Sequence, residues 1–116
     1  MITAPRSVAP ARARVANLVQ TRIERALGGR ARYRYVKPQV VAEGQGWKII
    51  SPCCSRRVDP AGGVIDIAWI EPLEDGYWRL HARDHARARW QPVLEWSRLE
   101  PLLDHLRVDP GREFWK

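Results

Sequence analysis

The chain has 116 residues, of which 45% are hydrophobic and 28% are charged, and its formal net charge is +7. A chain of this length forms one domain and buries roughly two-thirds of its unfolded surface, enough for a hydrophobic core without disulfide staples. It contains no run of about 18 apolar residues and no secretory signal. Two cysteines in a domain of this size do not indicate a disulfide scaffold. We therefore expect a bacterial-type cytoplasmic protein that does not enter a membrane.

The charge is distributed unevenly along the chain. Residues 1–57 carry twelve Lys or Arg against two acids, a net +10, whereas residues 58–116 carry eight against eleven, a net −3. This asymmetry indicates an acidic partner, either nucleic acid or an acidic protein. The alternative is that an Arg- and Ala-rich composition reflects a GC-rich genome, which places arginine on any solvated face.

Residues 1–10 are interpreted as a flexible leader and residues 11–116 as a single domain. A helix is predicted from about Ala11 to Gly28 and Gly29, which end it as C-cap residues. Its apolar residues recur at helical spacing and predict one buried stripe. The stripe consists of Val15, Leu18, Val19, Ile23, Ala26 and Leu27.

Residues 32–43 predict a first strand. Pro38 cannot donate to a ladder, so this strand is expected at an edge of the sheet. A glycine-containing turn then leads into a second strand over residues 47–51, and the two form a hairpin.

Residues 64–70 form the most strongly β-forming stretch of the chain. They follow a Pro- and Gly-containing turn and are apolar on both faces, which is typical of a central strand. Alternation puts Ile65, Ile67 and Trp69 on one face. The other face then contains Asp66 together with three apolar residues, Val64, Ala68 and Ile70, which offer a surface for a homodimer. Whether the protein is a monomer or a homodimer is left open.

Two further strands over residues 77–83 and 89–96 complete a three-stranded meander. Trp78, Leu80 and Ala82 are expected to face inward. The outward residues are Tyr77, Arg79, His81 and Arg83. In the last strand Trp90, Leu94 and Trp96 are expected on one face.

A final helix is predicted after Ser97, with Ser97 as N-cap and Glu100 completing a capping box. Its apolar face consists of Leu99, Leu102, Leu103 and Leu106, and Asp109, Pro110 and Gly111 end it. Phe114 and Trp115 are interpreted as a hydrophobic latch for the tail. We therefore predict an α+β fold, with an antiparallel sheet of about five strands (hairpin plus meander) and an N-terminal and a C-terminal helix packed on one face.

The last strands and helix resemble a known family. Residues 76–115 are similar to the C-terminal part of a bacterial family of uncharacterised proteins, the domain of unknown function 3024 family. The residues that carry the resemblance are Trp78, Leu80, Trp90, Leu102, Leu103, Phe114 and Trp115. The resemblance implies the fold, with an N-terminal helix before the sheet, and it implies no activity.

The outward sheet face is the first candidate site. Basic side chains interleaved with aromatic ones suit single-stranded nucleic acid, because phosphates and bases are bound by charge and by stacking. Its cationic members are Arg32, Arg34, Arg79, His81, Arg83 and Arg89, with Tyr33, Tyr35 or Tyr77 near them. A solvated sheet face is the alternative interpretation.

Cys53 and Cys54 form the second candidate site. Neighbouring Cα atoms about 3.8 Å apart are too close for a disulfide. One thiol near Arg56 and Arg57 is a candidate for raised reactivity, because guanidinium groups lower a thiol pKa. No cofactor is assigned; zinc is the alternative, and a zinc site would need His81 and His85 as further ligands. No catalytic residues are assigned, and a non-catalytic binding module is favoured over an enzyme.

Overall fold

The computed structural model describes residues 5–30, 37–52 and 63–115, with the backbone alone for residues 5–16. Along the chain, one helix precedes five strands and a second helix follows them. The elements are α1 (Pro5–Gly28), β1 (Gln39–Glu43), β2 (Gly46–Pro52), β3 (Val64–Pro72), β4 (Trp78–Asp84), β5 (Arg89–Trp96) and α2 (Glu100–Val108). Neither helix in the described part of the chain has the length and apolar character needed to span a membrane.

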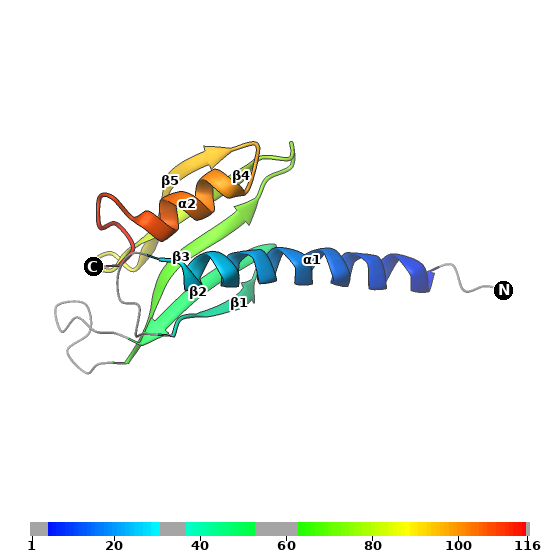
Figure 1. The fold of residues 1–116 in the computed structure, drawn as a ribbon, viewed down its shortest axis with the longest axis horizontal. Coiled ribbons are helices and arrows are strands. Elements are labelled where there is room, and N and C mark those ends of the chain that lie inside the picture. The colour runs from blue at the N-terminus through cyan, green and yellow to red at the C-terminus, as the bar shows by residue number, and fades with distance from the viewer. Residues whose placement is uncertain (1–4, 31–36, 53–62, 116) are drawn as a thin grey trace.

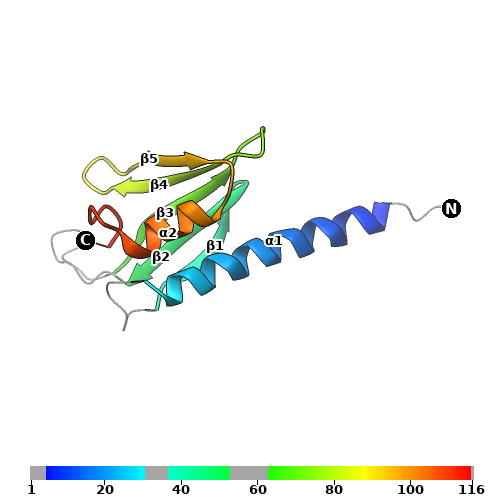
Figure 2. The ribbon, with the colours of Figure 1, turned by 45° about the horizontal axis from the view of Figure 1, so that its top comes forward.

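The strands form one antiparallel sheet in the order β1-β2-β3-β4-β5. Both helices lie on the same face of this sheet, α1 beside the β1–β2 hairpin and α2 beside β4 and β5 (Figures 1 and 2). The predicted α+β fold is confirmed. The central position of β3 and the edge position of β1 are confirmed as well, because every strand pairs with its neighbour in sequence.

Because β3 contains a bulge, its side chains are distributed between the two faces of the sheet differently from the prediction. Ile49 is opposite Ala68, but Ile50 is opposite Asp66, so Ile67 is an extra residue on β3. Ile67 and Ala68 are consequently both buried on the helix side. Trp69 shares the other side with Asp66 and not, as predicted, with Ile67.

A second bulge, in β5, separates residues that were expected together. Leu80 is opposite Leu94, whereas the next residue, His81, is opposite Pro92. Val93 is therefore the extra residue, and alternation is reset across it. The prediction that Trp90 shares a face with Leu94 and Trp96 is wrong for this reason.

The core lies between the sheet and the two helices. Val19, Ile23 and Leu27 of α1 are buried, as predicted, and α2 contributes Leu102, Leu103 and Leu106. Each fully buried side chain of this kind contributes about 1.5–3 kcal/mol. Ala68 and Ile70 are also fully buried here, so the homodimer surface expected on β3 is occupied by the chain's own helices.

Three boundaries and one side chain differ from prediction. Helix α1 begins at Pro5 and not near Ala11. Strand β1 begins at Gln39, directly after Pro38, and residues 31–36 lie outside the described part. Helix α2 has Leu99 at its N-cap, with no side-chain hydrogen bond, so the capping box does not form. Leu18, expected in the core, is 66% exposed.

Asp109 anchors the C-terminal tail. The residue is fully buried and ends α2 in the left-handed conformation, with φ of 48°. Its carboxylate accepts hydrogen bonds from the backbone N–H groups of Glu113 at 2.7 Å, Trp115 at 2.8 Å and Phe114 at 3.3 Å. The Trp115 indole N–H donates to the Leu106 carbonyl at 3.0 Å. Phe114 and Trp115 are buried, which confirms the latch.

We expect Asp109→Ala to lower the free energy of unfolding by about 3 kcal/mol, measured by urea denaturation. The substitution leaves buried backbone donors without an acceptor, which costs more than the loss of an average hydrogen bond. The control is Asp104→Ala, which removes a carboxylate from an exposed pair with Arg107. Exposed pairs contribute about 0–1 kcal/mol. Equal losses in both variants would contradict the assigned role of Asp109.

Candidate interaction face of the sheet

The open face of the sheet, opposite the helices, is assigned by strand register. Residues directly opposite one another in an antiparallel ladder point to the same side. Trp69 is opposite Lys48 on one neighbour and His81 on the other, and Arg83 is opposite Trp90. The charged and aromatic members of the open face are Glu43, Lys48, Asp66, Trp69, Glu71, Arg79, His81, Arg83, Trp90 and Glu95.

Aromatic rings occupy the middle of the open face. The ring centroids of Trp69 and His81 lie 4.7 Å apart with 27° between the planes, and those of Trp69 and Trp90 lie 6.2 Å apart. The Arg83 guanidinium lies 4.9 Å from the centroid of the Trp90 ring, a cation–π contact. The Trp69 indole N–H donates to the Glu43 carbonyl at 3.2 Å. The cluster is thus held by ring contacts across three strands and by a hydrogen bond to β1.

Ion pairs surround these rings on the β4–β5 side. Arg79 Nε donates to Glu95 Oε2 at 2.7 Å, and Arg79 Nη1 lies 3.7 Å from Glu71 Oε1. His81 Nε2 lies 3.0 Å from the same oxygen of Glu71. Glu71 therefore faces two cationic or potentially cationic groups at once.

A second group of pairs lies on the β2–β3 side. Lys48 Nζ is 3.4 Å from Asp66 Oδ1 and 3.7 Å from Glu43 Oε1. Arg83 Nε is 3.8 Å from Asp66 Oδ2. Three Lys or Arg side chains of the open face thus meet four carboxylates, so in the described part of this face Lys and Arg do not outnumber the acids. Partly exposed pairs contribute little to stability, about 0–1 kcal/mol each, but they cancel the local positive field.

His81 lies on the outward side, as predicted, but it is 5% exposed. Its Nδ1 atom is buried and has no hydrogen-bond partner among the residues that the structure describes. An ionised Glu71 accepts a hydrogen bond from Nε2, so the neutral ring is inferred to carry its proton on Nε2. His81 thus packs between Trp69 and Glu71 and presents little surface to a ligand.

The structure brings together three of the six residues proposed for the basic face: Arg79, His81 and Arg83. Arg89 is opposite Asp84, one position beyond the Arg83–Trp90 pair, so alternation turns it to the other side of the sheet. Arg32 and Arg34 lie outside the described residues.

Sequence reasoning missed the acids of the open face and both of its tryptophans. Asp66 was expected on the face opposite Trp69, Trp69 was expected with Ile65 and Ile67, and Trp90 was expected with Leu94 and Trp96. The bulges at Ile67 and Val93 move all three. Pro92, next to Val93, is a sequence signal for a bulge or an edge strand, whereas no glycine or proline adjoins Ile67. The available signal was the alternation of acids with arginines across paired strands, as in Glu71, Arg79 and Glu95.

Cys53 and Cys54 lie outside the described residues, so the thiol or zinc site stays a prediction. His85 follows β4 in the tight turn that leads into β5. Register places this turn at the same end of the sheet as Pro52, the residue before Cys53, because β2 and β4 both end there. Among the described residues no group of three His, Cys, Asp or Glu is arranged to hold a metal ion.

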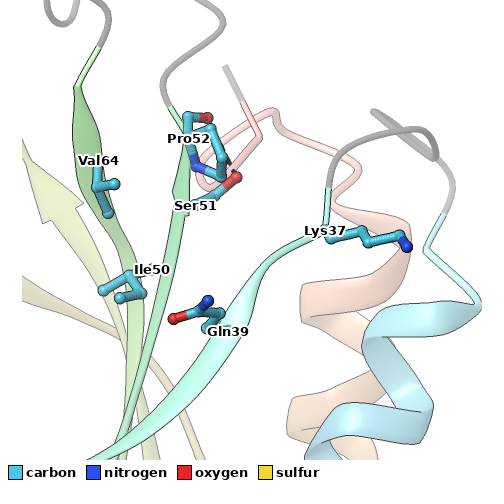
Figure 3. Close-up of a pocket in the computed structure, with 6 residues that line it drawn as sticks. All are labelled: Lys37, Gln39, Ile50, Ser51, Pro52 and Val64. Atoms are coloured by element: carbon cyan, nitrogen blue, oxygen red, sulfur yellow. Dashed lines mark hydrogen bonds between the residues drawn. The ribbon is translucent and has the colours of Figure 1, made fainter.

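A hollow of about 100 Å³ lies at this end of the sheet (Figure 3). Ile50 and Val64, from adjacent strands, form its apolar side. The complete lining is Lys37, Gln39, Ile50, Ser51, Pro52 and Val64. Typical small-molecule pockets enclose roughly 300–1,000 Å³, so the hollow accommodates a single side chain and not a cofactor.

The turn between β4 and β5 is fixed by Asp84. Its carboxylate accepts the backbone N–H of Arg87 at 3.1 Å and a hydrogen bond from the Arg87 guanidinium at 3.1 Å. The backbone hydrogen bond, with the side-chain one second, lowers the pKa of Asp84 below its ordinary value. Ala88 completes the turn with a positive φ of 52°.

We expect Asp84→Asn to lower the melting temperature at neutral pH, and expect the difference from the parent chain to shrink as the pH falls below about 4. The pKa of Asp84 is lower in the folded state than in the unfolded state. Its contribution to stability is therefore fully present at a pH above the unfolded-state pKa, and it is lost as the pH falls through the folded-state pKa. Glu74→Gln, the same charge change in the turn between β3 and β4, is the control. A difference that persists unchanged in acid would refute this role.

The chain was compared with protein families, with curated proteins and with solved structures. The family described as "Domain of unknown function (DUF3024)" matches residues 11–116. No curated protein and no solved structure matches. The match covers both helices' buried faces and the whole sheet, and it confirms the resemblance carried by the tryptophan and leucine positions. The chain therefore belongs to the DUF3024 family.

Proposed function

We propose that this domain is a non-catalytic binding module for an acidic macromolecule, with single-stranded nucleic acid as the preferred partner. The supporting observation is how its charge is distributed. Residues 17–30, 37–52 and 63–115 contain twelve Lys or Arg and twelve Asp or Glu. The entire net charge of +7 therefore belongs to residues 1–16, 31–36, 53–62 and 116. These segments carry eight Lys or Arg and one acid.

This distribution changes which residues of the basic face are expected to bind phosphate. Arg79 and Arg83 are already paired with carboxylates of the same face, so a phosphate would have to compete with Glu71, Glu95 or Asp66. Arg32 and Arg34 belong to a segment that contains no acid. We therefore assign phosphate contacts first to Arg32 and Arg34.

The open face contributes stacking in this proposal. Trp69 on the central strand and Trp90 on the edge strand β5 are partly exposed, and their ring centroids lie 6.2 Å apart. Base–aromatic stacking contributes about 1–3 kcal/mol per base and tolerates any sequence. A module of this kind binds with little sequence preference and with strong salt dependence.

The test is fluorescence anisotropy of a labelled single-stranded oligonucleotide titrated at several salt concentrations. We expect the parent chain to bind and the Arg32→Ser/Arg34→Ser double variant to bind more weakly, with a salt slope smaller by about 1.4, since each phosphate contact on a single strand contributes about 0.7.

The matched control is Arg87→Ser/Arg107→Ser, which removes two exposed arginines that are paired with Asp84 and Asp104. It also lowers the net charge by two, so a loss equal to that of the Arg32/Arg34 variant would indicate a non-specific charge effect. Absence of binding at low salt, or an affinity independent of salt, would refute the proposal.

The alternative function is thiol or metal binding at Cys53, Cys54 and His85. It is favoured by the position of the β4–β5 turn, which brings His85 to the sheet end where residues 53–62 begin and end. Elemental analysis and timed alkylation of the purified chain test it. Bound zinc, or one thiol that is alkylated much faster than the other, is the expected result; equal, slow alkylation without zinc would refute it.

A further inference from the structure

The N-terminal half of α1 extends beyond the sheet (Figures 1 and 2). The helix has 24 residues, about 36 Å at 1.5 Å per residue, and the domain measures 58 × 28 × 28 Å. The buried residues described on α1 start at Val19. We call residues 5–16 the α1 arm. Most of the stability of a helix in a protein comes from packing of an apolar face, so covering the arm would add to its stability.

The sheet end beside the arm has an exposed aromatic surface. Trp78 is directly opposite Trp96, and its ring centroid lies 6.2 Å from that of Trp47. All three point to the helix side, and they stand where β2 and β4 begin and β5 ends. Trp96 is 50% exposed, and Trp47 and Trp78 are partly buried against the core. We call these three residues the tryptophan ledge.

Arm and ledge match in size and in charge. The ledge runs from β2 to β5, three strand spacings or about 14 Å, and an arm of 12 residues is about 18 Å long. The arm contains three arginines and no acid in its sequence. The turn that leads into Trp78 contains Glu74 and Asp75, both exposed. A basic helix and an aromatic surface with an acidic rim are complementary.

Leu18 extends the apolar character of the arm into the described part of α1. It is 66% exposed, although it lies next to the buried Val19. In the sequence Val15, Ala11 and Val8 precede it at steps of three or four residues, the spacing of one helix face. The sequence of the arm thus continues the helical spacing of apolar residues that ends with Leu18.

We propose that the domain forms a twofold homodimer in which the α1 arm of each copy packs on the tryptophan ledge of the other. The arrangement is isologous, so the same contact forms twice and closes the assembly. It buries Leu18 and Trp96, which a monomer leaves in water, and places the arm's arginines near the acidic turn. This surface is distinct from the β3 face, where Ala68 and Ile70 are already buried.

Sedimentation velocity of the full chain over a range of concentrations tests the proposal. The parent chain is expected to sediment as a dimer, and Leu18→Ser and Trp96→Ser are each expected to raise the dimer dissociation constant at least about tenfold. Val64→Ser is the matched control. Val64 is also 66% exposed but stands at the opposite end of the sheet, so its substitution leaves dimerisation unchanged.

Charge-reversal variants distinguish specific packing of the arm on the ledge from non-specific association. Glu74→Lys/Asp75→Lys places two cations beside the ledge and is expected to weaken the dimer, and Arg12→Glu/Arg14→Glu added to it is expected to restore the dimer in part. Circular dichroism of each variant checks that the fold is retained.

Three results would overturn the proposal. The first is a parent chain that stays monomeric at every concentration, and the second is a dimer that withstands both Leu18→Ser and Trp96→Ser. The third is a monomer whose oligonucleotide binding is lost in Trp96→Ser, which would assign the ledge to nucleic acid. Because the anisotropy assay of the proposed function uses Arg32 and Arg34, failure of one proposal is distinguishable from failure of the other.

Discussion

The extra residue at Ile67 determines what each face of this sheet presents. A one-residue insertion in a strand exchanges the two faces for every position beyond it. In β3 it allows Ile67 and Ala68 to be buried in succession, so the central strand fills the core without a gap. The same insertion turns Trp69 to the open face, where it contacts His81 and Trp90.

The composition of the open face follows from this arrangement. With Asp66 and Glu71 on the same side as Arg79 and Arg83, the cations of the sheet are paired within the domain. A face that looks basic in one strand has no excess of Lys and Arg over acids once the neighbouring strands are included. Electrostatic attraction for a polyanion depends on the summed field and not on the arginines of a single strand. The uncompensated charge therefore has to be sought in the segments outside the paired part of the sheet.

The domain has two ends with different chemical character. At one end lie the β1–β2 and β3–β4 turns and the tryptophan ledge, and the α1 arm extends past this end of the sheet (Figure 1). At the other end, α2 is joined to the tail through Asp109, whose carboxylate accepts hydrogen bonds from three backbone N–H groups of the tail. The tail also contacts the segment that follows α1, since the Arg30 guanidinium lies 5.2 Å from the centroid of the Trp115 ring. The self-association proposed at the first end would leave the open face and the second end available for a partner.

Local sequence signals were sufficient for the order of the elements, the antiparallel pairing and the central position of β3. Gly and Pro punctuation, β-branched residues and helical spacing are short-range properties, and they predicted both helices, the edge position of β1 and the Phe114–Trp115 latch. Helix boundaries were predicted less accurately, because the first residue of a helix depends on how the helix packs. Ser97 was predicted as the N-cap of α2, but the helix begins at Glu100 and Leu99 is its N-cap.

The candidate site could be predicted only in part. Arg79, His81 and Arg83 alternate within one regular strand, so their common face was readable from period two alone. Their partners come from the two strands that contain bulges, β3 and β5: Asp66, Trp69, Glu71 and Trp90. The position of a bulge depends on how the core packs against the helices, so the faces of these residues could not be predicted from alternation within one strand. What the sequence alone determined is therefore the set of elements and their order. Which side chains meet was decided by the tertiary structure, because register across a sheet is a property of several strands together.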